Sequence, residues 1–238
     1  MKLSIVVPAY NEEKSIADTL KGLKAQTYKD IELIVVDNNS KDRTGEIARQ
    51  YTDRVYTETT QGYIYAVIRG SKESSGELIT FCDADTVYPP DWAARIVKHF
   101  LDNQIVAVYG PCGTFDTSKW GSILNQIGYT AFLMVSKLFG LDNTAGFNFV
   151  MRKDVFDQVG GYDPAYKKMS PDIELGKRLK KKGKIVLDPT IVVASSARRF
   201  KEGGTFQTTW MFAKAWWSMV VGKTPNVDYN TYNSGVKK

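Results

Sequence analysis

Short apolar runs alternate with stretches of helical spacing through the first 110 residues, and this alternation constrains the fold more than any other feature. Residues 3–7 form a largely apolar, β-branched run that Pro8 closes, and residues 31–36 form a second run that ends at Asp37. Runs of this kind are typical of strands buried on both faces of a parallel sheet.

The other expected elements of this half continue the same order. Asn11 is the expected cap of the first helix, and Pro89 and Pro90 suit the first turn of the fourth. Helices are predicted at 12–26, 40–51, 62–74 and 91–101, and further strands at 54–57, 77–82 and 105–109. The order predicts an α/β fold with an open, Rossmann-like, mostly parallel central sheet and helices on both faces.

Polar or conformationally special residues stand where three of these strands end. They are Pro8 to Tyr10 after the first strand, Asp37 after the second, and Asp83 to Asp85 after the run that ends at Cys82. In open parallel sheets, ligands bind beyond the carboxyl ends of the strands. We therefore expect these three segments to meet in one site.

The Asp-x-Asp element at Asp83 and Asp85 carries the clearest chemistry. In an extended chain the two carboxylates point the same way. Their hard oxygens suit Mg²⁺ or Mn²⁺, ions that usually also hold the phosphates of a substrate. The tripeptide alone is common, and carboxylates that cap the next turn are the alternative interpretation.

The second half of the chain is less regular. Helices are predicted at 118–141, 171–182 and 205–221, and strands at 148–151, 184–187 and 191–194. No stretch of about 20 residues lacks charged and polar groups, so no membrane span is expected. The apolar part of the first residues is too short for a signal peptide, and a cytoplasmic location is expected.

Composition removes several classes of chemistry. The chain has 238 residues, one histidine (His99) and two cysteines (Cys82 and Cys112) outside any metal-ligand spacing. With one histidine and two cysteines, neither a zinc site nor a Ser-His-Asp hydrolase is expected. The two thiols are expected to be reduced. Neither a Gly-x-Gly-x-x-Gly fingerprint after the first strand nor a Gly-x-x-x-x-Gly-Lys-Ser/Thr loop is present. The net charge of +6 suits nucleic acid, an anionic membrane or phosphorylated substrates.

The ordered motifs resemble those of family 2 glycosyltransferases over about residues 1 to 200. The matching segments are Val6 to Glu13, Val35 to Asp42, Ser75 to Glu77, Phe81 to Asp85, Val155 to Asp163 and Asp172 to Leu175 with Arg178 and Leu179. The resemblance implies a GT-A fold, a nucleotide-sugar donor, a Mn²⁺ or Mg²⁺ ion and inversion at the anomeric carbon. It leaves the sugar open, and Asp37 is compatible with uridine or guanosine donors, that is, a UDP- or GDP-sugar.

The resemblance also implies roles for individual residues. Asp172 matches the catalytic base, Asp37 the nucleobase ligand, and Asp83 and Asp85 the metal side of the donor site. The full set expected to bind the donor is Pro8, Tyr10, Glu12, Asp37, Asp83, Ala84, Asp85, Arg69, Arg198 and Arg199. Arg198 and Arg199 are included in this set because they follow the last expected strand, where they can bind phosphate.

One domain is expected over residues 1–222, with a nucleotide-sugar half at about 1–110 and an acceptor half at about 111–222. Residues 223–238 form a polar tail. The chain departs from the family where Pro171 precedes Asp172 instead of glutamate, and it lacks the late histidine of some relatives. The metal would then rely on one or two carboxylates, diphosphate oxygens and water. Glu174 is the alternative base.

Two aromatic-rich helical segments, 123–141 and 205–221, leave the acceptor open. They can be core helices, a dimer face or interfacial helices that touch lipid through tryptophan with lysine nearby. A dense basic run from Lys177 to Lys184 is either a solvated helix end or a membrane-facing patch. Peripheral contact with the cytoplasmic membrane face would fit a polyprenyl or other lipid-linked acceptor, and a glycan is the other acceptor class.

Two other functions compete with glycosyl transfer. A sugar-phosphate nucleotidyltransferase uses a similar sheet and metal carboxylates but usually needs a basic, glycine-rich loop after the first strand, where this chain has the acidic segment 8–13. A non-catalytic nucleic-acid-binding protein would use the positive charge. The basic residues lie in one late cluster without interleaved aromatics, so no nucleic-acid partner is expected.

Overall fold

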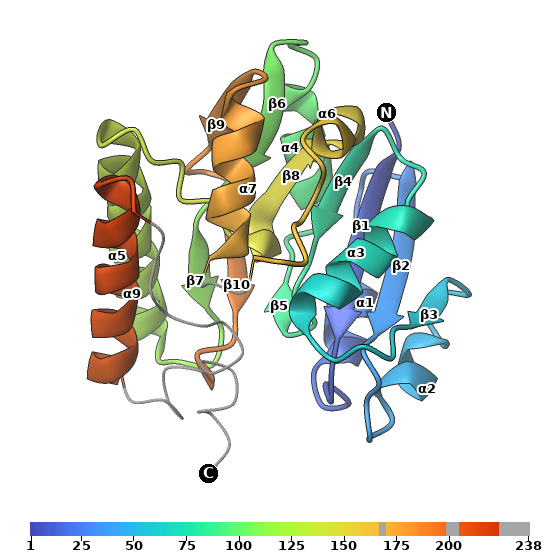
Figure 1. Ribbon diagram of the computed structural model, residues 1–238. Coiled ribbons are helices and arrows are strands. Elements are labelled where there is room, and N and C mark those ends of the chain that lie inside the picture. The colour runs from blue at the N-terminus through green and yellow to red at the C-terminus, as the bar shows by residue number, and fades with distance from the viewer. Residues whose placement is uncertain (167–169, 199–204, 224–238) are drawn as a thin grey trace.

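A seven-stranded sheet forms the centre of the protein in the computed structural model, which describes residues 1–166, 170–198 and 205–223 (Figure 1). The strand order is β3-β2-β1-β4-β8-β6-β9. The strands are β1 (Leu3–Ala9), β2 (Ile31–Asp37), β3 (Val55–Thr57), β4 (Leu78–Phe81), β6 (Ile105–Tyr109), β8 (Phe149–Arg152) and β9 (Lys184–Leu187).

The sheet is mostly parallel, as the alternation of strands and helices predicts. Within the described residues, β8 is the one strand of this sheet that runs antiparallel to its neighbours, β4 and β6. Strand β1 lies between β2 and β4, with Ala9 opposite Asp37. The carboxyl ends of these three strands therefore meet at one edge.

Helices cover both faces of this sheet. Side chains of β1 alternate between two cores, with Leu3, Ile5 and Val7 in one and Val6 in the other. The first core is covered by α1 (Ile16–Lys24), α2 (Thr44–Ala48) and α4 (Trp92–His99), and the second by α3 (Tyr63–Glu73), α6 (Lys153–Gln158) and α7 (Pro171–Lys180). The predicted α/β class is confirmed.

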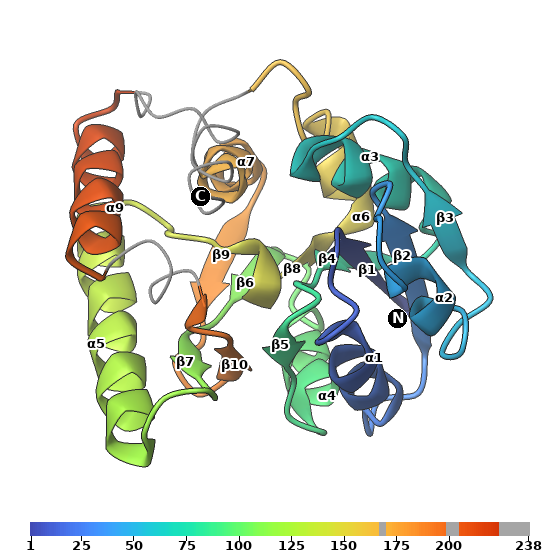
Figure 2. The same ribbon diagram turned by 90° about the horizontal axis from the view of Figure 1, so that it is seen from below.

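A second, three-stranded sheet lies beside the carboxyl edge of the first (Figure 2). Its order is β5-β10-β7, with β5 at Thr86–Val87, β7 at Cys112–Thr114 and β10 at Val193–Ser195. Of these three strands the sequence predicts only β10, at 191–194, which is two residues early at its start and one at its end. Strands of two and three residues carry no periodicity, so their pairing depends on contacts between distant segments.

Two long helices, α5 (Lys119–Leu138) and α9 (Thr205–Val220), lie side by side at one edge of the molecule in both views (Figures 1 and 2). The rings of Phe132 and Trp216 join them, with centroids 5.7 Å apart, and Trp216 Nε1 donates to Ser136 Oγ at 2.8 Å. Leu133 and Ser136 on the inner face of α5 are fully buried.

The start of the first helix differs from the prediction. Asn11 does not cap it, because α1 begins at Ile16 with Ser15 before it. Asn11 instead adopts a left-handed conformation (φ 55°), donates its N–H to Ser40 Oγ at 3.0 Å, and accepts from the Lys41 N–H at 2.8 Å. Residues 11–15 thereby remain a loop at the edge of the sheet.

Glu32 is a buried carboxylate on β2, and its side chain is only 2% exposed. It accepts from Ser4 Oγ at 2.5 Å, from the Ser75 N–H at 2.8 Å and from Lys2 Nζ at 3.0 Å, and it pairs with Arg54. Burial raises its pKa, but these hydrogen bonds outweigh burial and lower the pKa from 4.5 to about 2.

Replacing Glu32 with glutamine should lower the free energy of unfolding by about 2 kcal/mol at pH 7. A lowered pKa in the folded state stabilises above the unfolded value of 4.5, and this stabilisation is lost as the pH falls toward 2. Urea unfolding at several pH values should show the deficit shrinking over that window. Asp53→Asn, at an exposed position, is the control. A deficit that does not change with pH would contradict the assignment.

Candidate active site

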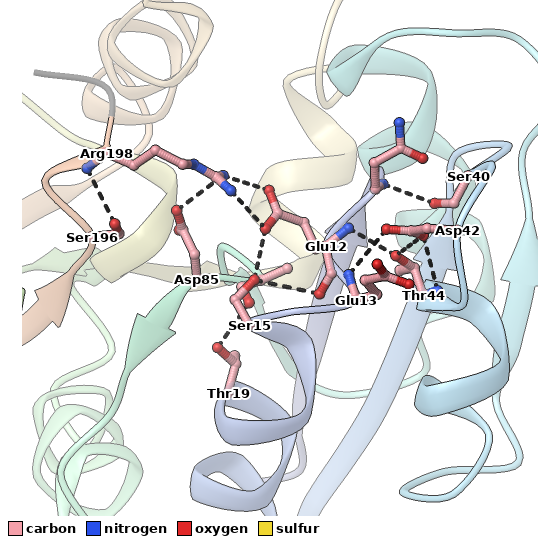
Figure 3. A network of polar contacts seen from close by, with 12 residues as sticks. Glu12, Glu13, Ser15, Thr19, Ser40, Asp42, Thr44, Asp85, Ser196 and Arg198 are labelled. Atoms are coloured by element: carbon pink, nitrogen blue, oxygen red, sulfur yellow. Dashed lines mark hydrogen bonds and ion pairs between the residues drawn. The ribbon is translucent and has the colours of Figure 1, made fainter. Parts of the chain in front are cut away.

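Two loops at the carboxyl edge of the sheet are hydrogen-bonded to each other (Figure 3). The N–H of Glu12 donates to Thr44 Oγ1 at 2.8 Å, and the N–H of Glu13 donates to Asp42 Oδ2 at 3.2 Å. The loop after β1 is therefore fixed against the loop after β2. Pro8, half-buried in β1, and Tyr10, exposed just beyond it, lie at the start of this paired region.

Asp37 ends β2 beside this pair of loops. Its Oδ1 accepts from the Ser40 N–H at 3.0 Å. Asn38 then joins the segment before α3, since its Nδ2 donates to the carbonyl of Thr60 at 2.8 Å and its Oδ1 accepts from the Gly62 N–H at 2.8 Å. These hydrogen bonds fix the segment after β2 and the segment before α3 beside the partly exposed carboxylate of Asp37.

Ala84, the middle residue of the Asp83-Ala84-Asp85 segment, anchors this segment to α1. Ala84 is buried, and Thr19 Oγ1 of α1 lies 3.0 Å from the carbonyl oxygens of both Ala84 and Thr86. Asp83 and Asp85 on either side of Ala84 stay partly exposed. The backbone of this segment is thus anchored through the carbonyls of Ala84 and Thr86.

Arg198 connects the last strand to the acidic loops (Figure 3). Its Nη2 lies 2.6 Å from Glu12 Oε1 and 3.4 Å from Asp85 Oδ2. The N–H of Ser196 donates to the carbonyl of Asp85 at 3.3 Å, and Asp116 Oδ1 accepts from the Ala197 N–H at 2.7 Å. The Arg198 side chain is 48% exposed, so a phosphate can reach it.

Asp172 lies in the first turn of α7, after Ser170 in a left-handed conformation (φ 63°). Burial raises the pKa of Asp172, while hydrogen bonds from Tyr162 Oη and the Gly146 N–H lower it, and burial prevails. A Cβ at Gly146 would lie 3.2 Å from Asp172 Oδ1 and 2.8 Å from Tyr63 Oη, so the close approach needs glycine. A carboxyl group with a raised pKa in a fixed position is suited to proton transfer.

Cys112 lies near the carboxylates of Asp83 and Asp85, and Tyr129 lies near both Cys112 and Asp172. Burial raises the pKa of the Cys112 thiol to about 12, and the nearby carboxylates of Asp83 and Asp85 contribute to the rise. Burial likewise raises the pKa of Tyr129, with further contributions from Cys112 and Asp172. Residues 146–148 connect the two regions, because the Gly146 N–H donates to Asp172 and Tyr88 Oη, just after β5, donates to the carbonyl of Phe147 at 2.9 Å.

Two of the predicted residues have partners outside this site, and a third lies outside the described residues. Arg69 pairs with Glu73 at 3.0 Å and lies over the ring of Tyr56, 5.4 Å from its centroid. Glu174, the alternative base, pairs with Arg178 at 2.6 Å. Arg199 lies outside the described residues, as does nearly all of the predicted polar tail.

The donor set at β4 fits a hard divalent ion. Among the described residues no group of three or more His, Cys, Asp or Glu side chains could hold a metal. Asp83 and Asp85 nevertheless offer carboxylate oxygens, and Asp85 already faces the cationic group of Arg198. Mg²⁺ and Mn²⁺ commonly use one or two carboxylates together with substrate phosphates and water.

An α/β fold of the GT-A type with an acidic site of this kind is typical of sugar-transferring enzymes. The model of the family "Glycosyl transferase family 2" matches residues 4–160. The chain belongs to this family.

Similar proteins agree with this assignment. Glucosyl-dolichyl phosphate glucuronosyltransferase of Haloferax volcanii is 31% identical over 68% of this chain and 56% of its own length. Dolichol-phosphate mannosyltransferase of Pyrococcus furiosus is 32% identical over 45% of this chain and 32% of its own length. The chain spans about half the length of several curated relatives that it matches.

Solved structures share the fold. A mannosyltransferase of Pyrobaculum calidifontis, in complex with GDP-Man and Mn²⁺, has a TM-score of 0.70 at 16% identity and covers 99% of this chain and 68% of its own. Glucosyl-3-phosphoglycerate synthase of Mycobacterium tuberculosis, with Mn²⁺ and UDP-glucose, has a TM-score of 0.66 at 19% identity, over 94% of this chain and 81% of its own.

Proposed function

We propose that the protein is a metal-dependent, inverting glycosyltransferase that moves a sugar from a nucleoside diphosphate to an acceptor oxygen. One observation carries the proposal: the carboxylates of Asp83 and Asp85 lie near Cys112, and the carboxyl group of Asp172 lies near Tyr129, which itself adjoins Cys112. Residues 1–110 would bind the donor, and residues 111–222 the acceptor.

The donor side would use groups already fixed by the fold. Pro8, Tyr10 and Asp37 are proposed to hold the nucleoside, since a carboxylate accepts hydrogen bonds from the N–H groups of a uracil or guanine base. Arg198 is proposed to bind the diphosphate. Similar proteins with GDP-Man or UDP-glucose and Mn²⁺ support this donor class.

Asp83 and Asp85 are proposed to hold a Mn²⁺ or Mg²⁺ ion. When bound, such an ion offsets the negative charge that develops on the departing diphosphate. Arg198 pairs with both Asp85 and Glu12, so its guanidinium sets the charge beside Asp85.

Asp172 is proposed to accept the proton of an acceptor hydroxyl. The acceptor oxygen forms a bond to the anomeric carbon as the bond from that carbon to the diphosphate oxygen breaks, which inverts the configuration. The proton moves to the carboxylate of Asp172, and the electron pair of the broken bond leaves with the nucleoside diphosphate.

The acceptor is proposed to be lipid-linked, and the protein to act at a membrane surface. Relatives named for dolichyl-phosphate substrates support this acceptor class. No helix in the described ranges has the length and hydrophobicity needed to span a bilayer. Contact with lipid would therefore be peripheral in the part described.

A thermal-shift panel tests the proposal. UDP, GDP and their sugar conjugates would be added with and without Mn²⁺. A ligand at a hundred times its Kd stabilises the folded state by about 2.7 kcal/mol, which corresponds to roughly 5–10 °C for a chain of this size. We expect one nucleoside diphosphate to raise the Tm by this amount only with Mn²⁺. Stabilisation by nucleoside triphosphates alone, with release of pyrophosphate, would contradict the proposal and indicate nucleotidyl transfer.

A further inference from the structure

Helix α5 exposes a continuous apolar stripe along its outer face. Trp120 is 76% exposed and Leu138 is 86% exposed, although both are large hydrophobic residues. Between them the other exposed large hydrophobic residues recur at helical spacing, namely Ile123, Leu124, Ile127, Met134 and Val135. The stripe runs along the whole helix, so it is a surface rather than a few scattered side chains.

Helix α9 extends this surface with further aromatic residues. Trp210 and Trp217 are exposed, and Lys214 lies over the ring of Trp210, 5.3 Å from its centroid. Because α5 and α9 lie side by side at the edge of the molecule (Figures 1 and 2), their exposed residues form one face. We call this face, formed by the exposed residues of α5 and α9, the α5/α9 face.

The charge of the α5/α9 face has one sign. Residues 117–141 and 205–223 contain no aspartate or glutamate. Their cations are Lys119, Lys137, Lys214 and Lys223, of which Lys137 pairs with the neighbouring Asp142. Exposed tryptophan, an apolar stripe and unopposed lysine together are the composition of helices that lie in the interface of an anionic bilayer.

We infer that the α5/α9 face docks on an anionic membrane surface. A second copy of the chain is the less suitable occupant. In a two-fold dimer the same patch faces itself, so lysine would meet lysine without an acidic partner. Phospholipid headgroups supply the missing negative charge, and the acyl region accepts the apolar side chains.

Docking by this face would explain how a lipid-linked acceptor reaches the candidate site, and this explanation rests on the proposed function. Tyr129 of the same α5 helix lies within electrostatic reach of Asp172, and α5 packs against β7 beside Cys112. The helix that touches lipid on its outer side thus packs on its inner side against β7, where Ser122 Oγ donates to the carbonyl of Thr114, and β7 begins at Cys112 of the candidate site. A lipid-linked acceptor could enter the site while its chain stays in the bilayer.

Vesicle sedimentation tests the inference. We expect the protein to bind vesicles of phosphatidylcholine with phosphatidylglycerol, and to bind vesicles of phosphatidylcholine alone at least several-fold more weakly. The double variant L124E/L138E should weaken binding by at least about tenfold, since burial of each leucine is lost. Lys214→Glu should weaken binding only to the anionic vesicles.

Matched controls lie on α4 and at its end. Leu101 is 78% exposed outside the α5/α9 face, so Leu101→Glu should bind vesicles as the wild type does, and so should Lys98→Glu. Unchanged binding by L124E/L138E would overturn the inference. So would a dimer in analytical ultracentrifugation that this double variant dissociates. Donor binding, measured separately by calorimetry, should be unchanged in every surface variant, so a failure of docking is distinguishable from a failure of the proposed function.

Discussion

Replacing Asp172 with asparagine should lower the turnover of a hydroxyl acceptor by about a thousandfold while donor affinity stays unchanged. The asparagine side chain keeps the size of the aspartate but cannot accept a proton. Donor affinity should hold, because Asp83, Asp85 and Arg198 lie on other segments of the site. Steady-state kinetics with calorimetry of donor binding would separate the two effects. Normal transfer to a hydroxyl by this variant would exclude the base role.

A pH profile checks the same assignment independently. The base acts when deprotonated, and burial raises the pKa of Asp172 above 3.8, so the acid limb of kcat/KM should lie above that value. The hydrogen bond from Tyr162 lowers the pKa, so Tyr162→Phe should move the limb to higher pH. A limb that stays in place in Tyr162→Phe would show that Asp172 does not govern it.

The Asp172 variant also separates the two lipid-linked acceptor classes. A phosphate is already ionised at neutral pH and needs no base, whereas a glycan hydroxyl does. With a polyprenyl phosphate as acceptor, Asp172→Asn should therefore retain most of its turnover. With a lipid-linked glycan it should lose turnover as with any hydroxyl.

The central sheet could be predicted from the sequence because β1, β2 and β6 are largely apolar runs of five to seven residues, and stretches of helical spacing separate the strands of the first half. The start of α1 could not, since local capping by Asn11 competes with hydrogen bonds to Ser40 and Lys41, about thirty residues away. The strands β5 and β7 are too short to leave a pattern. The sequence therefore predicted well the elements that have a regular apolar pattern. It predicted poorly the segments whose conformation depends on contacts with residues distant in the chain.

The candidate site follows the same division. Asp83 and Asp85 could be proposed as carboxylates at a strand end, whereas Asp172 was proposed from the resemblance to the family. Thr19 and Tyr162 were not, because each acts through one contact: Thr19 with backbone carbonyls 65 and 67 residues away, and Tyr162 with Asp172. The family motif includes Tyr162, and that match was the only sequence signal for its position.

Arg69 was predicted to bind the donor but has other partners in the structure. Its place in the helix after Gly62 favoured a role at the diphosphate, yet its side chain lies between Glu73 and the ring of Tyr56. A helix begins at the edge of the sheet and then runs away from it, so a residue two turns along is carried away from the site.

Replacing Asp85 with alanine should remove the dependence of donor binding on Mn²⁺ and weaken binding with the ion by at least about a hundredfold. The fold should survive, since buried Ala84 and Thr19 anchor this segment rather than the carboxylate of Asp85. Calorimetric titration of the nucleoside diphosphate with and without Mn²⁺ measures the effect, and circular dichroism checks the fold.

Arg198→Ala is the matched variant, because Arg198 adjoins the same carboxylate but carries the opposite charge. It should weaken diphosphate binding in the presence of Mn²⁺, since a phosphate ligand is lost, yet keep the response to the ion. Without nucleotide, it should bind Mn²⁺ more tightly than the wild type, because the guanidinium no longer competes for Asp85 and Glu12. If Asp85→Ala still gained donor affinity from Mn²⁺ as the wild type does, the ion would not be held by this carboxylate, and the proposed metal site would be wrong.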